Sequence, residues 1–110
     1  MLTSALEQGA AGERVLVLFH SAAFAKQMAQ RFYEMGLNDP EVSMTPKRGE
    51  RFEFAGGGLV EFRTADPGVL QGSSMSFRDV KVHADHAIGH LLPARKQHEL
   101  WQFLKSRGAR

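Results

Sequence analysis

The chain has 110 residues, no cysteine and a formal net charge of +2. This length suits one domain with its own core, and the lack of cysteine excludes disulfides, a thiol nucleophile and cysteine-bound zinc. An apolar content of 43% is ordinary for a globular protein. No apolar run approaches the ~20 residues of a membrane span, and no secretory signal pattern opens the chain. We therefore expect a single-domain, cytoplasmic protein that does not enter a membrane.

The chain begins with a predicted helix followed by a predicted strand. Leu2 to Gln8 favours a short helix, with Thr3 or Ser4 as its cap. Arg14 to Phe19 is a continuous apolar run of strand length. Its β-branched content is typical of a strand that is buried on both faces, as in a parallel sheet.

The next segment carries the clearest helical pattern in the chain. Ser21 is a suitable N-cap, and Gly36 is the expected C-terminal stop. Between them, apolar residues recur at helical spacing: Phe24, Met28, Phe32 and Met35. A strand followed by a helix at this spacing predicts the opening of a βαβ unit.

The middle of the chain predicts a loop and then a β-hairpin. Asn38 to Glu50 is polar and contains two prolines and a glycine, so we expect it to be a loop. Arg51 to Ala55 and Leu59 to Thr64 both alternate between apolar and polar residues. The triple glycine Gly56–Gly58 between them can adopt the positive φ angles of a tight turn.

The last third of the chain predicts a loop, a strand and a helix. Ala65 to Ser76 is rich in turn residues, and Phe77 to His83 alternates like a strand. Pro93 is placed to open the final helix. The apolar face of that helix comprises Leu100, Phe103 and Leu104, with Trp101 at its margin.

Together these elements predict a three-layer α/β domain. Its sheet is small, mixed and mainly parallel, with a β-hairpin, and helices lie on its faces. Most phenylalanines fall on predicted inward positions, so core packing explains them better than base stacking does. They are Phe19, Phe24, Phe32, Phe52, Phe54, Phe62 and Phe77.

One long stretch carries a family resemblance. From Gly58 to Ala87 an apolar strand leads through a loop with Leu70-Gln71-Gly72 to a second strand that ends at Asp85. This order resembles the second half of the ATPase core of phage large terminases and related helicase-like motors. There, a G-x-I-x-F-x-[ST] strand leads through an L-[RQ]-G loop to Asp-Glu-Ala. The upstream run Gly12 to Leu18 is similar to the G-x-R-V-L-V-L strand of the same motors.

The departures from that family indicate a protein that does not hydrolyse ATP. No G-x-x-x-x-G-K-[ST] motif occurs, so the phosphate-binding loop and its lysine are missing. By the resemblance, Asp85 occupies the place of the magnesium-binding aspartate, and His86 replaces the catalytic glutamate. We therefore expect a degenerate, non-enzymatic relative without a cofactor. The alternative is an unrelated α/β protein with a similar pattern.

A histidine-rich segment is a further candidate site. Imidazole and carboxylate groups together suit zinc and similar ions, but the end of a strand also collects polar residues for no such reason. We expect no metal, and the weak candidate ligands are His83, Asp85, His86 and His90.

Two classes of function remain open from the sequence. The first is a phage- or mobile-element-derived protein that acts through a protein partner in DNA metabolism, with Trp101 and Phe103 as contacts. The second is direct nucleic-acid binding. An exposed sheet edge would also permit a homo-oligomer. The candidate nucleic-acid-binding residues are Lys47, Arg48, Arg51, Arg95, Lys96, Lys105 and Arg107.

Overall fold

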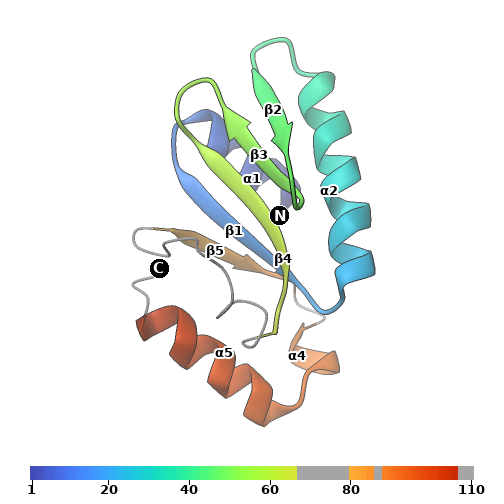
Figure 1. Ribbon diagram of the computed structural model, residues 1–110, viewed down its shortest axis with the longest axis vertical. Coiled ribbons are helices and arrows are strands. Elements are labelled where there is room, and N and C mark those ends of the chain that lie inside the picture. Colours follow the sequence, from blue (N-terminus) through green and yellow to red (C-terminus); the bar gives the residue numbers. More distant parts are fainter. Residues whose placement is uncertain (67–79, 86–87, 107–110) are drawn as a thin grey trace.

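A mixed five-stranded sheet organises the part of the chain that the computed structural model describes, residues 1–66, 80–85 and 88–106 (Figure 1). The strands are β1 (Arg14–Phe19), β2 (Met44–Lys47), β3 (Arg51–Phe54), β4 (Leu59–Thr64) and β5 (Lys81–Ala84). Their order in the sheet is β2-β3-β4-β1-β5. β1 is parallel to β4 and β5, whereas β3 is antiparallel to β2 and β4. Only β3 is reversed, so the predicted mixed, mainly parallel sheet with a hairpin is confirmed.

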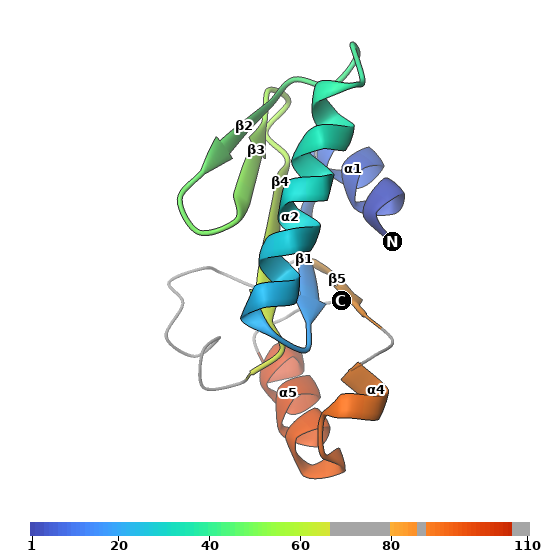
Figure 2. The same cartoon turned by 90° about the vertical axis from the view of Figure 1, so that its right-hand side faces the viewer.

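Helices cover both faces of this sheet and produce three layers (Figure 2). The helices are α1 (Leu2–Ala10), α2 (Ala22–Leu37), α4 (Ile88–Leu91) and α5 (Ala94–Ser106). α1 and α2 pack on one face, and α5 packs on the other. The predicted α/β architecture is therefore confirmed. Within the described ranges, no helix combines the length and apolar character needed to cross a membrane.

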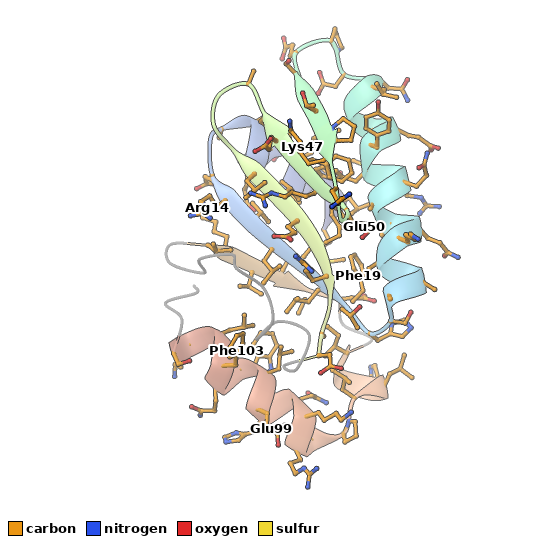
Figure 3. All side chains as sticks on the ribbon, in the orientation of Figure 1. Arg14, Phe19, Lys47, Glu50, Glu99 and Phe103 are labelled. Carbon is orange, nitrogen blue, oxygen red and sulfur yellow. The ribbon has the colours of Figure 1, made fainter. Side chains whose placement is uncertain are left out.

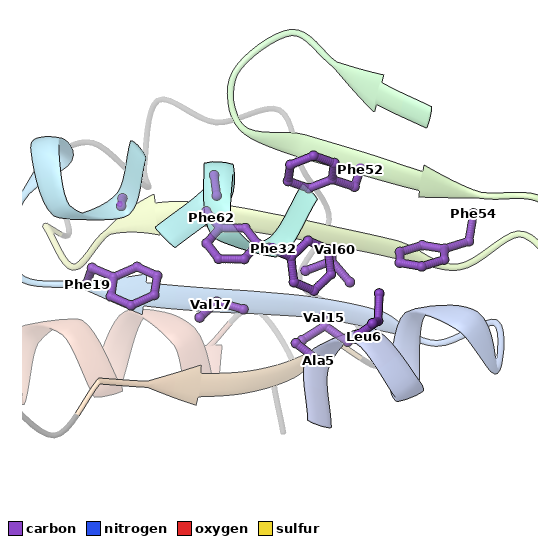
Figure 4. Packing of buried hydrophobic residues seen from close by; sticks show 12 residues of the cluster. Ala5, Leu6, Val15, Val17, Phe19, Phe32, Phe52, Phe54, Val60 and Phe62 are labelled. Atoms are coloured by element: carbon purple, nitrogen blue, oxygen red, sulfur yellow. The ribbon is translucent and has the colours of Figure 1, made fainter. Parts of the chain in front are cut away.

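Aromatic side chains fill the layer between the sheet and the first two helices (Figure 4). The Phe32 ring of α2 lies 5.1 Å from the Phe62 ring and 5.2 Å from the Phe52 ring. Rings at these separations add to the free energy gained by burying them. The predicted core role is confirmed for Phe19, Phe32, Phe52, Phe54 and Phe62; Phe24 is partly buried, and Phe77 lies outside the described residues.

The second layer packs β1 against the C-terminal helix. Leu16 and Leu18 of β1 contact a cluster that includes Leu100 and Leu104 of α5. Alternate residues of β1 face the aromatic layer instead, and all five residues from Val15 to Phe19 are fully buried. The prediction of a strand buried on both faces is confirmed.

The helix boundaries differ from the sequence prediction at two points. Met1 is the N-cap of α1 and no side chain caps it, so the predicted cap at Thr3 or Ser4 is wrong. The cap of α2 is confirmed, because Ser21 Oγ accepts a hydrogen bond from the Phe24 N–H at 3.1 Å. The predicted stop at Gly36 is wrong, since α2 continues to Leu37. Gly36 is instead a contact point, where a β-carbon would collide with the end of the β2 side chain Met44.

The segment from Asn38 to Glu50 is not entirely loop, because it contains β2. Ala55 N–H donates to the Ser43 carbonyl, and antiparallel pairing alternates from there. The backbone of Pro46 therefore points away from β3, where its missing N–H removes no bond from the sheet. Apolar periodicity did not predict this strand, because it contains a proline and exposed polar residues.

The final elements agree with the sequence prediction where they are described. β5 begins at Lys81 and ends at Ala84, one residue beyond the predicted strand end, and residues 77–79 lie outside the described ranges. Pro93 immediately precedes α5, and its carbonyl accepts a bond from the Gln97 N–H at 3.1 Å. The predicted opening of the last helix is confirmed.

The triple glycine forms the predicted β3–β4 turn and also packs against the end of α1. Gly57 has a φ of 94°, a conformation that glycine adopts without strain. A β-carbon on Gly58 would overlap the backbone oxygen of Gly9 and lie 3.2 Å from the Glu13 oxygen. Only glycine at this position allows α1 and the turn to approach so closely.

We predict that Gly58→Ala destabilises the protein by about 1–3 kcal/mol or more, because the new methyl group meets backbone that cannot move aside. The measurement is the free energy of unfolding in urea. Gly89→Ala is the matched control, since no described residue lies within 4 Å of the position that a β-carbon would take there. Equal stability of the two variants would contradict the close approach at Gly58.

Candidate interaction surfaces

The first basic group lies on the β2–β3 hairpin. Lys47 and Arg51 are directly opposite each other in the register of β2 and β3. Both lie on the sheet face opposite the aromatic layer, because Phe52 faces that layer and side chains alternate along a strand. Lys47 Nζ lies 3.3 Å from the Glu53 carboxylate, and both side chains are about half exposed (Figure 3). Arg48 is exposed in the turn between the strands.

The second basic group lies on α5. Arg95, Lys96 and Lys105 are exposed on this helix, and Arg95 Nε lies 3.8 Å from the Glu99 carboxylate one turn away. Arg107 lies outside the described residues. α5 is at one end of the molecule, away from the β2–β3 hairpin (Figure 1). The structure therefore does not gather the candidate nucleic-acid-binding residues into one patch.

The two aromatic candidates on α5 have different environments. Phe103 is partly buried and packs against the cluster formed by Leu100, Leu104 and β1. Trp101 is 43% exposed, and Lys105 follows it one helical turn later. Phe103 therefore helps to hold α5 against the sheet, whereas Trp101 is open to a partner.

The histidine-rich segment is spread over several elements. His83 Nε2 lies 2.7 Å from Gln8 Oε1 of α1, and His90 is exposed on α4. Asp85 follows β5 directly, and its N–H donates to the Leu18 carbonyl at 3.0 Å. His86 lies outside the described residues. Among the side chains that the structure places, no three histidine, aspartate or glutamate groups assemble as a metal site requires.

Burial is the largest cause that lowers the pKa of His83 below its ordinary value of 6.5. The charges of the N-terminal amine and of Lys81 lower this pKa further. The strand β5 holds Lys81 near His83, and Lys81 pairs with Glu13 at 2.6 Å. Protonation of His83 therefore opposes the docking of α1 on β5.

A buried charge pair on β4 was not predicted from the sequence. Glu61 is only 1% exposed, and its Oε1 accepts a hydrogen bond from Arg63 Nε at 2.7 Å. In register it lies between Arg51 of β3 and Leu16 of β1. Within the described part of the chain, Glu61 Oε2 and Arg51 Nε are buried without hydrogen-bond partners. The alternation in β4 was the available signal, because it places Glu61 on the face opposite Phe62.

We expect the stability of the protein to fall as the pH drops below about 6.5 toward the lowered pKa of His83. The unfolded chain binds this proton more readily than the folded chain, so the contribution is intact above that range and lost below it. Urea unfolding at several pH values measures the slope of the free energy of unfolding against pH. His83→Gln should flatten it, because an uncharged amide can still donate to Gln8. His98→Gln, on the exposed side of α5, should leave it unchanged; an equal effect of both substitutions would refute the role of His83.

The Glu61–Arg63 pair predicts an asymmetry between its two single substitutions. Arg63→Gln leaves a buried carboxylate without compensation, which costs about 3–5 kcal/mol. Glu61→Gln should cost less, because the Arg63 side chain is 33% exposed and stays hydrated. Lys47→Gln breaks an exposed pair and should change stability by less than about 1 kcal/mol. Chemical unfolding of the three variants tests this order, and a larger loss for Glu61→Gln than for Arg63→Gln would contradict it.

Comparison of the chain with protein-family models, with curated proteins and with solved structures found no match. The chemistry of its own surfaces is therefore the basis on which its function can be inferred. Two surfaces stand out: the exposed side of α5 around Trp101, and the charged side of the β2–β3 hairpin.

Proposed function

We propose that this chain is a non-enzymatic binding protein that contacts a protein partner of DNA metabolism through the exposed side of α5. The observation that carries the proposal is Trp101, a large aromatic side chain that is 43% exposed on a well-anchored helix. Tryptophan beside basic residues is a frequent anchor of protein interfaces.

The anchoring of α5 makes its exposed side a rigid platform. Leu100 and Leu104 are buried against β1, and Phe103 is packed beside them. Trp101 lies next to this buried stripe, and Lys105 lies one turn further along the same exposed side. A partner that covers the indole would gain its hydrophobic burial without having to order the helix first.

The proposed origin of the protein is a degenerate motor ATPase core from a phage or mobile element. The resemblance on residues Gly58 to Ala87 supports this origin, as does the position of Asp85 at the carboxyl end of β5, next to β1. The missing phosphate-binding loop supports a role without ATP hydrolysis and without a cofactor. Binding, rather than catalysis, is then the activity left to the fold.

Direct nucleic-acid binding through the basic groups is the second candidate function. Arg48, Lys96 and Lys105 are exposed and available for phosphate contacts. Such contacts release counterions, so the affinity would fall steeply with added salt. An interface built around Trp101 would tolerate salt much better.

The test of the proposed function uses the fact that Trp101 is the sole tryptophan of the chain. Proteins captured from lysate by the wild-type chain are identified, purified and titrated while the tryptophan emission is followed. We expect a blue shift of the emission, because the partner removes water from the indole, and a loss of at least about 2 kcal/mol of binding free energy for Trp101→Ala.

Gln102→Ala is the matched control, since it alters an exposed neighbour on the same helix. It should bind as the wild-type chain does, at low and at high salt. A captured protein that binds Trp101→Ala as tightly as the wild-type chain, with no change in emission, would overturn the proposal.

A further inference from the structure

A groove lies between α2 and the β2–β3 hairpin, and its volume is about 470 Å³. This volume is within the range of small-ligand sites in proteins. α2 runs beside the edge of the sheet that β2 forms, so the groove is open along the side of the molecule (Figures 1 and 2). Its lining residues are Lys26, Ala29, Gln30 and Tyr33 of α2, and Pro46, Lys47, Glu50 and Phe52 of the hairpin.

The floor of the groove is aromatic and held in place by the core. The Tyr33 ring is stacked on the Phe52 ring, with centroids 6.1 Å apart and planes inclined by 17°. Phe52 is buried and in turn contacts Phe32 and Phe62. The half-buried Tyr33 ring is therefore a flat apolar surface whose orientation is fixed before any ligand arrives.

The groove presents one positive and one negative side chain. Lys26 of α2 and Glu50 of the hairpin turn both line it. The ammonium group of Lys47 does not add to this charge, because the Lys47 side chain lies on the opposite sheet face and pairs there with Glu53. Among the described residues, no ion pair within 4.0 Å engages Lys26 or Glu50. Both charges are therefore available to a ligand that enters the groove.

The backbone at Glu50 indicates that its carboxylate has a role beyond the turn. Glu50 has a φ of 53°, in the left-handed region that a glutamate adopts only at a cost in free energy. Its carbonyl accepts a hydrogen bond from the Phe62 N–H at 3.0 Å, so the sheet fixes this conformation. Glycine or asparagine would form the same turn more readily. Residues held in such conformations gather at ligand sites, and the turn itself does not account for a glutamate.

We propose that this groove binds a free aromatic amino acid, with its ring against Tyr33, its carboxylate at Lys26 and its ammonium group at Glu50. A zwitterion carries the two charges that the groove leaves unpaired, and an aromatic side chain covers the exposed face of the tyrosine ring. The amide of Gln30, one helical turn from Lys26, supplies a donor and an acceptor for the charged end of the ligand. This site is separate from α5, which lies at another end of the molecule (Figure 1).

The same features disfavour other occupants. A nucleic-acid strand would bring several phosphates to a groove in which Glu50 cancels the charge of Lys26. A peptide strand added to the outer edge of β2 would lack a hydrogen-bond donor at Pro46, whose backbone faces that edge. A residue inside a peptide has neither a free ammonium group nor a free carboxylate, so it would leave both charges of the groove unpaired.

Isothermal titration calorimetry with L-phenylalanine and a series of analogues tests the proposal. L-Alanine lacks the ring, phenethylamine lacks the carboxylate, and 3-phenylpropionate lacks the ammonium group. N-acetyl-L-phenylalaninamide lacks both charges and represents a residue inside a peptide. We expect L-phenylalanine to bind at least about ten-fold more tightly than each analogue, because every analogue loses one or more of the three contacts.

Charge variants assign each contact by its dependence on the probe. Glu50→Gln should weaken the binding of L-phenylalanine about three- to ten-fold and leave that of 3-phenylpropionate no weaker. Lys26→Gln should weaken the binding of L-phenylalanine to a similar degree and leave that of phenethylamine no weaker. Tyr33→Leu should reduce the preference for L-phenylalanine over L-alanine, whereas Tyr33→Phe should retain it. Lys105→Gln on α5 is the matched control and should bind every probe as the wild-type chain does.

Glu50→Asn separates the site from the stability of the fold, because asparagine tolerates the left-handed conformation. This variant should unfold at a higher urea concentration than the wild-type chain and yet bind L-phenylalanine as weakly as Glu50→Gln does. Backbone amide NMR shifts caused by L-phenylalanine should fall on α2 and the β2–β3 turn. The proposal is overturned if L-phenylalanine does not bind at millimolar concentration, if it shifts only amides of α5, or if Glu50→Gln and Lys26→Gln weaken all probes equally.

Discussion

The burial of β1 on both faces is the constraint on which the rest of the structure depends. Its residues from Val15 to Phe19 are completely buried, and successive side chains enter the aromatic layer and the α5 layer in turn. A strand of this kind needs a parallel neighbour on each side and a helix above and below. β4, β5, α2 and α5 satisfy those needs, so the three layers follow from six residues.

The same constraint explains why charge lies inside the sheet. β4 pairs with β1 along its whole length, and its alternation places Phe62 in one layer and Glu61 in the other. Only the lower part of that second face is covered by α5, whereas β2 and β3 extend past it (Figures 1 and 3). On the hairpin side, two ion pairs therefore take the place of apolar packing: Glu61 with Arg63, and Lys47 with Glu53.

The elements that sequence reasoning predicted are those that a local sequence pattern specifies. β1 and α2 carry long apolar patterns, and the triple glycine specifies the β3–β4 turn, so each was found close to its observed limits. β2 was missed because an edge strand is held by backbone pairing and can contain a proline such as Pro46. The extension of α2 past Gly36 was missed because the sequence pattern predicts a helix stop at this glycine. Its small size is instead required by packing against Met44. For the candidate surfaces, the sequence identified Lys47 and Trp101 individually, but the buried position of Glu61 between β3 and β1 becomes visible only when the strands are placed side by side.

The two proposed surfaces use different physical forces, and that difference has a functional consequence. Contact at Trp101 depends on apolar burial, which salt does not weaken, whereas phosphate contacts with exposed basic residues depend on charge, which salt screens. The β2–β3 hairpin and α5 lie at different ends of the molecule (Figure 1), so a partner on α5 would leave Arg48 of the hairpin open. On either proposal the chain acts by binding, and added salt separates the two, because only phosphate contacts release counterions.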